Sequence, residues 1–348
     1  MVMMVKENAE DLKARTLRAL RSPPKLKARA VFLHDFFIHS IVRYEYSFDE
    51  FLESLRDAYE RGSGELQGFR QEVEGGGQAS GIAFSLASLG VDCKLLTRAG
   101  EMGEKMSDLL LPGVEVKSFQ GTPGLATTLG FPPDINIGMC YPGSNENFPP
   151  SLIIKEDFSE VDLICINNYW LNRSGGELLQ HVLEKTKSRI YLTTGNPAGH
   201  ERDFLILFNI LRNSKGRVRT SLSEAEALYY MRAFEIDHTG DRLSVDEVSD
   251  LSGMLGCSVD LHTPDYTISS KYIVPTFRLK TIYRSIGAGN LWDGGNIYGI
   301  LARLKADERL VLANGLAGLR ISQVSTWLKR ATLDDVRAFV EENTLKAI

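Results

Sequence analysis

The chain has 348 residues, of which 43% are hydrophobic and 24% are charged, and its formal net charge at pH 7 is −5. The length is sufficient for one large α/β domain or two ordinary domains. The composition is that of a globular protein and excludes an intrinsically disordered one. The acidic balance argues against a nucleic-acid partner, because no broad basic surface is left to pair with phosphates. No apolar run approaches the ~18 residues of a membrane span, so we expect no membrane segment.

The N-terminus and the cysteines point to the same compartment. The first twenty residues are charged and amphipathic, without the apolar core of a signal peptide. The four cysteines lie far apart in the chain, and no C-x-x-C pair or H-E-x-x-H sequence occurs. This spacing favours reduced thiols in a cytoplasmic protein over a disulfide framework or a zinc site. The cysteines are Cys93, Cys140, Cys165 and Cys257.

Taken in chain order, the first predicted elements are a helix over 7–20 and a breaker, SPPK, at 22–25. A continuous apolar run then predicts a buried central strand over 31–37. Apolar residues at helical spacing predict a helix within 47–62. A glycine-rich turn, a helix and a further strand follow over 75–97.

The pattern changes between Val114 and Phe148, where short β segments are punctuated by Gly and Pro. We expect short antiparallel strands here, in a small sheet that projects from the main domain. Beyond this stretch, strands and helices alternate to about residue 263. Such alternation is typical of a doubly wound parallel sheet with helices on both faces, so the predicted fold class is α/β.

The segment SIGAGNLWDGG, at 285–295, lies between a strand-like stretch and an apolar helical run. Neither it nor the glycine cluster at 75–77 completes G-x-G-x-x-G, and the chain has no G-x-x-x-x-G-K-[ST]. A nicotinamide oxidoreductase or a P-loop enzyme therefore has little support. The backbone N–H groups of 287–290 could instead hold an anion at a helix N-terminus. The alternative is a plain strand-to-helix turn, for which glycine is also convenient.

Four segments occur in an order that resembles the ribokinase-like (PfkB) family of carbohydrate kinases. They are GGGQASGIAFSLASLG near residue 80, SLSEAEA near 223, SIGAGNLWDGG near 290 and LANGLAGL near 316. The third is similar to the family's G-A-G-D signature, and the resemblance extends over nearly the whole chain after residue 28. It implies a helical extension at 1–28 and a kinase domain at 29–348, a doubly wound sheet sandwich whose small β lid comes from about 40–74 and 114–148.

The resemblance also implies a reaction and its site. ATP, with Mg²⁺, would donate its γ-phosphate to a sugar, polyol or nucleoside hydroxyl, and a homodimer through the lid is a further option. Gly287, Ala288 and Gly289 would form the anion hole. The substrate would contact Asp35, His39, Gly76, Gly77, Gln78 and Gly81; the nucleotide would contact Ser223, Glu226, His262, Thr263 and Asn314; and Glu226 and Asn196 would serve the metal.

The chain departs from the family pattern at positions to which the resemblance assigns catalytic or binding roles. Asn290 stands where the family has the aspartate that accepts the hydroxyl proton, and an amide is not an effective base near neutral pH. Asp293, one helical turn further on, is a candidate substitute base, because side chains at i and i+3 are neighbours on a helix. It could equally be a first-turn acid that favours the helix dipole. Polar site positions are also changed at Ser223, Gly81, His39 and Asn196.

Two hypotheses follow from these departures. The first is an ATP- and Mg²⁺-dependent kinase of a sugar or related alcohol, weakened by Asn290. The second is a catalytically reduced protein of the same fold that binds a nucleotide or a sugar as a sensor or assembly subunit. An unrelated dinucleotide-binding enzyme is a remote third option, because its glycine fingerprint is incomplete.

Overall fold

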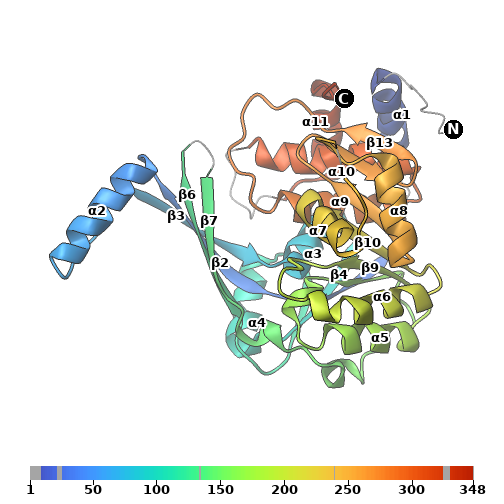
Figure 1. Ribbon diagram of the computed structural model, residues 1–348, viewed down its shortest axis with the longest axis horizontal. Helices are drawn as coiled ribbons and strands as arrows, with labels where there is room; N and C mark the ends of the chain where they lie inside the picture. The colour runs from blue at the N-terminus through green and yellow to red at the C-terminus, as the bar shows by residue number, and fades with distance from the viewer. Residues whose placement is uncertain (1–8, 22–25, 133–134, 239, 324–329, 348) are drawn as a thin grey trace.

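The computed structural model describes residues 9–21, 26–132, 135–238, 240–323 and 330–347. A large layered body carries a narrow arm that projects from one side (Figure 1). The centre of the body is a nine-stranded sheet, parallel from β11 to β5 and antiparallel where β12 and β13 join it. In spatial order its strands are β13 (Tyr272–Pro275), β12 (Tyr266–Ser269), β11 (Ser258–His262), β10 (Val218–Ser223), β9 (Arg189–Thr193), β8 (Leu163–Ile166), β1 (Arg29–His34), β4 (Asp92–Thr97) and β5 (Glu115–Ser118).

The predicted central strand is β1, which pairs in parallel with β4 on one side and β8 on the other. It begins at Arg29 and ends at His34, earlier than expected, because Phe37 already belongs to the arm. Its side chains alternate between two cores: Phe32 packs into one and Leu33 into the other. This alternation is the period-two geometry of a strand buried on both faces.

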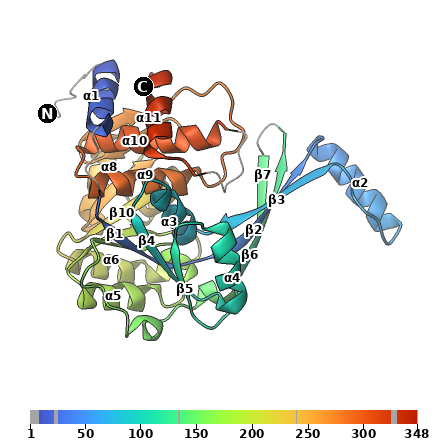
Figure 2. The same ribbon diagram turned by 180° about the vertical axis from the view of Figure 1, so that it is seen from behind.

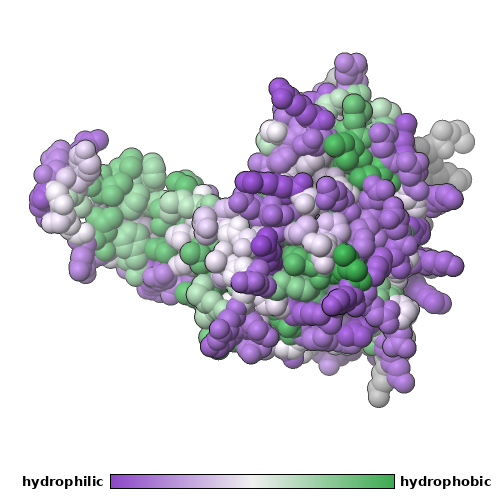
Figure 3. Space-filling model, turned by 90° about the horizontal axis from the view of Figure 1, so that it is seen from below, coloured by the Kyte–Doolittle hydropathy of each residue, from purple (hydrophilic) through white to green (hydrophobic). Residues whose placement is uncertain are grey.

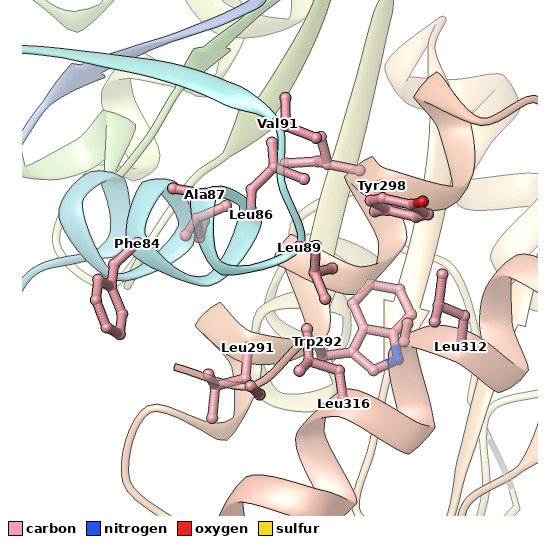
Figure 4. Close-up of a cluster of buried hydrophobic side chains, with 14 of the residues drawn as sticks. Phe84, Leu86, Ala87, Leu89, Val91, Leu291, Trp292, Tyr298, Leu312 and Leu316 are labelled. Atoms are coloured by element: carbon pink, nitrogen blue, oxygen red, sulfur yellow. The ribbon is translucent and has the colours of Figure 1, made fainter. Parts of the chain in front are cut away.

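Helices cover both faces of the sheet, as a doubly wound fold requires. On the face of Phe32, α3, α9 and α10 enclose a cluster of buried apolar side chains (Figure 4). Each fully buried Leu or Phe of this kind contributes roughly 1.5–3 kcal/mol. This face holds α1 (Ala9–Arg21), α3 (Gln78–Ser88), α4 (Gly100–Leu110), α9 (Ala288–Leu301), α10 (Ala306–Ile321) and α11 (Leu333–Glu342), and the other holds α5 (Gly175–Lys185), α6 (Phe204–Asn213), α7 (Glu224–Ala233) and α8 (Val245–Leu255).

The arm is a four-stranded sheet, called the small sheet below. Its strand order is β3 (Phe69–Gly76), β2 (Phe37–Tyr44), β6 (Gly124–Phe131), β7 (Ile135–Tyr141), and α2 (Phe48–Glu60) lies at its far end (Figures 1 and 2). One expectation needs correction. The strand at 115–118 pairs with β4 in the main sheet, so the second half of the small sheet starts at Gly124 rather than near Val114. The antiparallel strands expected in this stretch are β6 and β7, and the central pair, β2 with β6, is parallel because the chain returns to the main body between them.

The N-terminal helix α1 begins at Ala9 and packs on α10 and α11 rather than extending away from the body. Leu20 is buried, and Arg15 pairs with Asp307 and Glu308 at the start of α10. The predicted breaker at 22–25 lies outside the described residues. None of the described helices combines the length and the apolar character that crossing a membrane would take. All four cysteines are free thiols.

Candidate active site

The N-terminus of α9 separates two clefts. Gly287 is its N-cap, with φ of 79°, a left-handed conformation that glycine adopts without strain. Gly287 and Asn290 line one cleft, whereas Ala288 and Gly289 line the other. The N–H of Ala288 donates to the Ser285 carbonyl, 3.1 Å away. Among the described residues, no backbone carbonyl accepts from the other three N–H groups of 287–290, so they are free to bind an anion.

The first cleft, of about 400 Å³, lies between the small sheet and the N-termini of α3 and α9. It brings together residues that are up to about 250 positions apart in the sequence, because α3, α9 and the strands of the small sheet start or end at the same edge of the main sheet. Seven of the predicted residues line it: Asp35, His39, Gly76, Gly77, Gln78, Gly287 and Asn290.

Asp35 is wholly buried at the floor of the first cleft, where it caps α3. Its two carboxylate oxygens accept from the N–H groups of Gln78 and Ala79, at 2.8 and 2.7 Å. The amide of Asn168 donates to the same carboxylate at 3.2 Å. Gly77, with φ of 104°, permits the close approach, since a Cβ there would lie 2.9 Å from the carboxylate. The carboxylate is therefore fixed by a helix N-terminus, which stabilises its negative charge.

His39 belongs to a buried polar chain in the same cleft. Its Nδ1 lies 3.2 Å from Glu74, its opposite residue on β3, and its Nε2 lies 2.8 Å from the hydroxyl of Thr128. Arg284 also pairs with Glu74. The second oxygen of Glu74, Oε2, is buried and has no hydrogen-bond partner among the described residues. A hydroxyl of a bound ligand could donate to it, because a buried acceptor without a partner is costly.

Asn290 and Gly81, two of the predicted departures, touch each other. The amide of Asn290 donates to the carbonyl of Gly77 at 3.1 Å. A Cβ on Gly81 would lie only 2.7 Å from the Asn290 amide nitrogen, so a larger residue at 81 would displace this side chain. The two positions thus lie at one place beside the first cleft, next to the free N–H groups of α9. Gly81 itself does not line the cleft.

Asp293 does not face the first cleft, contrary to the expectation from helical spacing. Its side chain is buried against the sheet, where it accepts from the Tyr191 hydroxyl at 2.6 Å. Three residues along a helix turn the side chain by about 300°, and the remaining offset of about 60° directs it towards β9 instead. Burial raises the pKa of Asp293 to about 7. Asn296, one turn further along α9, donates to the same hydroxyl and to Asp260.

The second cleft, of about 510 Å³, lies between α9, α10, the start of α7 and the end of β11. His262 packs on the ring of Trp292, with centroids 5.1 Å apart, and burial lowers its pKa to about 4, so its ring is neutral at pH 7. Asn314 is held by Trp292 and by the Pro275 carbonyl, at 2.8 and 3.0 Å. Predicted residues in this cleft are Ser223, His262, Thr263, Ala288, Gly289 and Asn314, among apolar neighbours that include Phe277, Leu279 and Ile282.

The two predicted metal-binding residues line neither cleft. Glu226 forms a capping box with Ser223, whose N–H and hydroxyl donate to one carboxylate oxygen at 2.6 and 2.8 Å. Asn196 is exposed, and its side chain accepts from the N–H of Ala198. Within the described ranges, no group of three or more His, Cys, Asp or Glu could hold a metal. The chain fits Mg²⁺ only as an ion brought by phosphates. The carboxylates that line the clefts are Asp35 and Glu74 in the first and Glu224 in the second.

Sequence reasoning missed four polar residues in or beside the first cleft that bond to Asp35, to His39 or to one another. Glu74, Thr128 and Arg284 are brought to His39 by strand register and by the loop before α9, and Asn168 comes from the turn after β8. Only the pairing of β2 with β3 could have indicated Glu74, and register is not readable from one strand alone.

No family model matches the sequence, and no functionally curated protein matches it. Solved structures do match over most of the chain. The ribokinase of Thermotoga maritima superposes with a TM-score of 0.67 at 15% identity, covering 91% of this chain and 99% of its own. The Cryptococcus neoformans ribokinase in complex with ADP has a TM-score of 0.66 at 13% identity and covers 90% and 99%. The adenosine kinase of Sinorhizobium meliloti has a TM-score of 0.64 at 16% identity and covers 86% and 95%.

The chain has the ribokinase-like fold. The likeness extends through both sheets, since the matches cover nine-tenths of this chain. This ribokinase-like fold confirms the α/β class and the small second sheet that the sequence predicted. Identities of 12–16% show a shared fold but do not show which residues form the site.

Proposed function

We propose that the chain binds ATP in the second cleft and a sugar, polyol or nucleoside in the first, and transfers the γ-phosphoryl group between them. One observation carries the proposal: the N-terminus of α9 opens onto both clefts at once, with Gly287 in the first and Gly289 in the second. A phosphoryl group there would lie against free N–H groups and the positive end of a helix dipole. Phosphoryl transfer depends mostly on such positioning and charge stabilisation. ADP in a structural neighbour supports a nucleotide in this fold.

Among the described residues, the first cleft supplies no free base for the hydroxyl that would accept the phosphoryl group. An acceptor hydroxyl would donate its proton as it attacks phosphorus, and Asn290 cannot take that proton. The carboxylates of the first cleft, Asp35 and Glu74, are each engaged, by the α3 N-terminus and by Arg284 with His39. Mg²⁺ would supply charge neutralisation at the phosphates when it is bound with the nucleotide. We therefore propose that the protein is a slow kinase. We also propose that it acts in the cytoplasm, because its four cysteines are free thiols, which persist in a reducing compartment.

The second candidate function is binding without transfer. It is favoured by Asn290, whose amide stands where the resemblance implies the proton acceptor and donates to the Gly77 carbonyl. Gly81, where the resemblance implies a sugar-contacting asparagine, lies against the same amide. The two clefts remain intact in that case, and the protein would act as a nucleotide- or sugar-responsive subunit. Both candidate functions require nucleotide binding.

Adding ADP or ATP with Mg²⁺ should raise the melting temperature by several degrees. A ligand that binds only the native state stabilises it by about 2.7 kcal/mol at a hundred-fold excess over Kd.

The variant Ala288→Glu should weaken ADP binding ten-fold or more in calorimetry, because it adds a negative charge to the second cleft. Its matched control, Ala288→Gln, has the same shape without the charge. Absence of any shift with millimolar adenine nucleotide would count against both candidate functions.

We also propose that two copies associate through their arms. The residues of α2 are all exposed or half-exposed, and its apolar stripe is left in water, as is β7, the unpaired edge of the small sheet (Figure 3). Met139 and Cys140 of β7 also line the first cleft, so the arm of a second copy could close that cleft. The exposed apolar side chains of the arm include Phe48, Leu52, Leu55, Tyr59, Ile135, Ile137 and Tyr141.

A dimer of about twice 38.7 kDa should appear in light scattering at micromolar concentration. The double variant Leu52→Glu with Leu55→Glu should be monomeric, because it buries charge in the proposed contact. Glu53→Gln, on the polar side of the same helix, should remain dimeric. A monomeric parent protein would contradict the association.

A further inference from the structure

A third cavity lies at the opposite end of the main sheet from the two clefts. It is the largest of the three, at about 910 Å³. Its walls are the first residues of β8, β9, β10 and β11, together with the end of α9 and the start of α10. The two clefts lie at the carboxyl ends of these strands, so this cavity, called the basal cavity below, does not belong to the site already described.

The basal cavity is strongly basic in a chain whose net charge is −5. Three of its cations, Lys187, Arg189 and Arg303, are exposed and form no ion pair with any residue that the structure describes. Asp162 is the only acidic residue among the described residues that line it, and its carboxylate accepts from the backbone N–H of Arg29 at 2.9 Å. Convergent cations repel one another, so this arrangement costs free energy that a bound anion would recover.

Three further arginines, Arg217, Arg219 and Arg309, are held in place in the cavity wall, but within the described part of the chain they do not each have a carboxylate partner of their own. Arg217 donates to the carbonyls of Thr186 and Leu183, at 2.5 and 2.6 Å, so backbone groups rather than a carboxylate fix its position. Arg219 and Arg309 share one carboxylate, Asp260, at 2.6 and 2.7 Å.

Asp260 is the single carboxylate, among the residues that the structure describes, that pairs with both Arg219 and Arg309, so these three side chains together carry a net positive charge. Burial by itself would raise the pKa of its carboxyl group, but Arg309 and Arg219 hold that pKa well below its ordinary value. Arg309 is 4% exposed and also donates to the hydroxyl of Ser269 at 2.6 Å, so its guanidinium cannot swing away from the cavity wall. The floor of the basal cavity thus carries positive charge that is fixed in position by hydrogen bonds within the protein.

We propose that the basal cavity binds a small molecule that carries two or more phosphate groups. Arginine forks match phosphate oxygens with paired, charge-assisted hydrogen bonds. Cations are contributed from two sides, by the strand starts through Arg189 and Arg217, and by the α9–α10 junction through Arg303 and Arg309. A molecule with separated phosphates can reach both sides, and a concave site of this volume suits a small ligand rather than a nucleic acid, which would need an extended basic surface.

The test uses inorganic pyrophosphate as the probe, titrated calorimetrically into the full chain at low ionic strength. We expect binding that weakens as salt is added. The double variant Arg189→Gln with Arg303→Gln removes two exposed cations and should weaken binding about 100-fold, because each charge-assisted hydrogen bond to phosphate is worth about ten-fold in affinity. The matched control, Arg202→Gln with Arg232→Gln, removes two exposed arginines that do not line this cavity and should bind as the parent does.

Pyrophosphate could also bind at the N-terminus of α9, and Ala288→Glu separates the two locations. Binding that survives Ala288→Glu and is abolished in the Arg189→Gln, Arg303→Gln variant supports the basal cavity. Binding that is abolished in Ala288→Glu and survives in the double variant overturns the proposal, as does the absence of binding at millimolar pyrophosphate. Because all of these side chains lie at exposed or cleft-lining positions, circular dichroism should show an unchanged fold for each variant.

Discussion

The variant Asn290→Asp should transfer phosphate from ATP to its acceptor at least ~10² times faster than the parent protein, the range assigned to a positioned general base. This factor corresponds to about 2.7 kcal/mol of barrier at ~1.36 kcal/mol per decade. Asn290 lines the first cleft beside Gly287, so a carboxylate there would lie next to both the acceptor and the anion-binding N–H groups. The measurement is ATP turnover over a panel of sugars, polyols and nucleosides.

The local structure should tolerate this carboxylate. Position 290 lies in the first turn of α9, where the helix dipole favours an acidic side chain. The substitution removes the hydrogen bond from the Asn290 amide to the Gly77 carbonyl, worth about 1 kcal/mol. Repulsion from that carbonyl should turn the new carboxylate towards the first cleft, where it is needed.

Asn290→Ser is the matched control, because serine is polar and small but is no base near neutral pH. It should leave the rate at the parent level. If Asn290→Asp transfers no phosphate to any acceptor on the panel while ADP still binds, the kinase proposal fails and the binding function stands. The changes around Gly81 and His39 would then have disabled the acceptor side as well.

Asp293→Asn should remove a large pH dependence of stability and leave catalysis unharmed. Burial raises the pKa of Asp293 to about 7 in the folded protein, against an ordinary value of 3.8. Between these two values the folded state binds a proton that the unfolded chain has released, so stability falls as pH rises through this window. From pH 5 to pH 8 the decrease should be about 2–3 kcal/mol, at ~1.36 kcal/mol per pH unit up to the folded pKa.

Denaturant unfolding of both proteins at pH 5 and pH 8 measures this effect. The asparagine can still accept from the Tyr191 hydroxyl, so the variant should equal or exceed the parent in stability at pH 8. Glu341→Gln removes one negative charge from an exposed position, and it therefore controls for the change in net charge. Equal slopes for the parent and Asp293→Asn would contradict the raised pKa. Loss of activity in the Asn290→Asp, Asp293→Asn double variant, relative to Asn290→Asp, would restore Asp293 as a base.

Local sequence patterns predicted most of the fold because its elements bury apolar faces with regular periods. The apolar run of β1 and the alternation after residue 148 were sufficient for the doubly wound sheet. They were not sufficient for the strand at 115–118, whose place at the edge of the main sheet depends on pairing with β4. The apolar stripe of α2 has the spacing of a core-facing helix, yet no residue of α2 is buried. Periodicity identifies an apolar face but not what covers it.

By itself, the sequence predicted where an anion could bind, because glycines at the start of a helix leave backbone N–H groups unobstructed by side chains. Tertiary structure decided which polar side chains join them. It placed Asp293 against Tyr191 rather than in the first cleft, and it brought Glu74 to His39 across two strands. Helix rotation, strand register and burial set these contacts, and each depends on packing between segments that are distant in the chain. The basic residues of the basal cavity converge for the same reason, since parallel strands begin at one edge of the sheet.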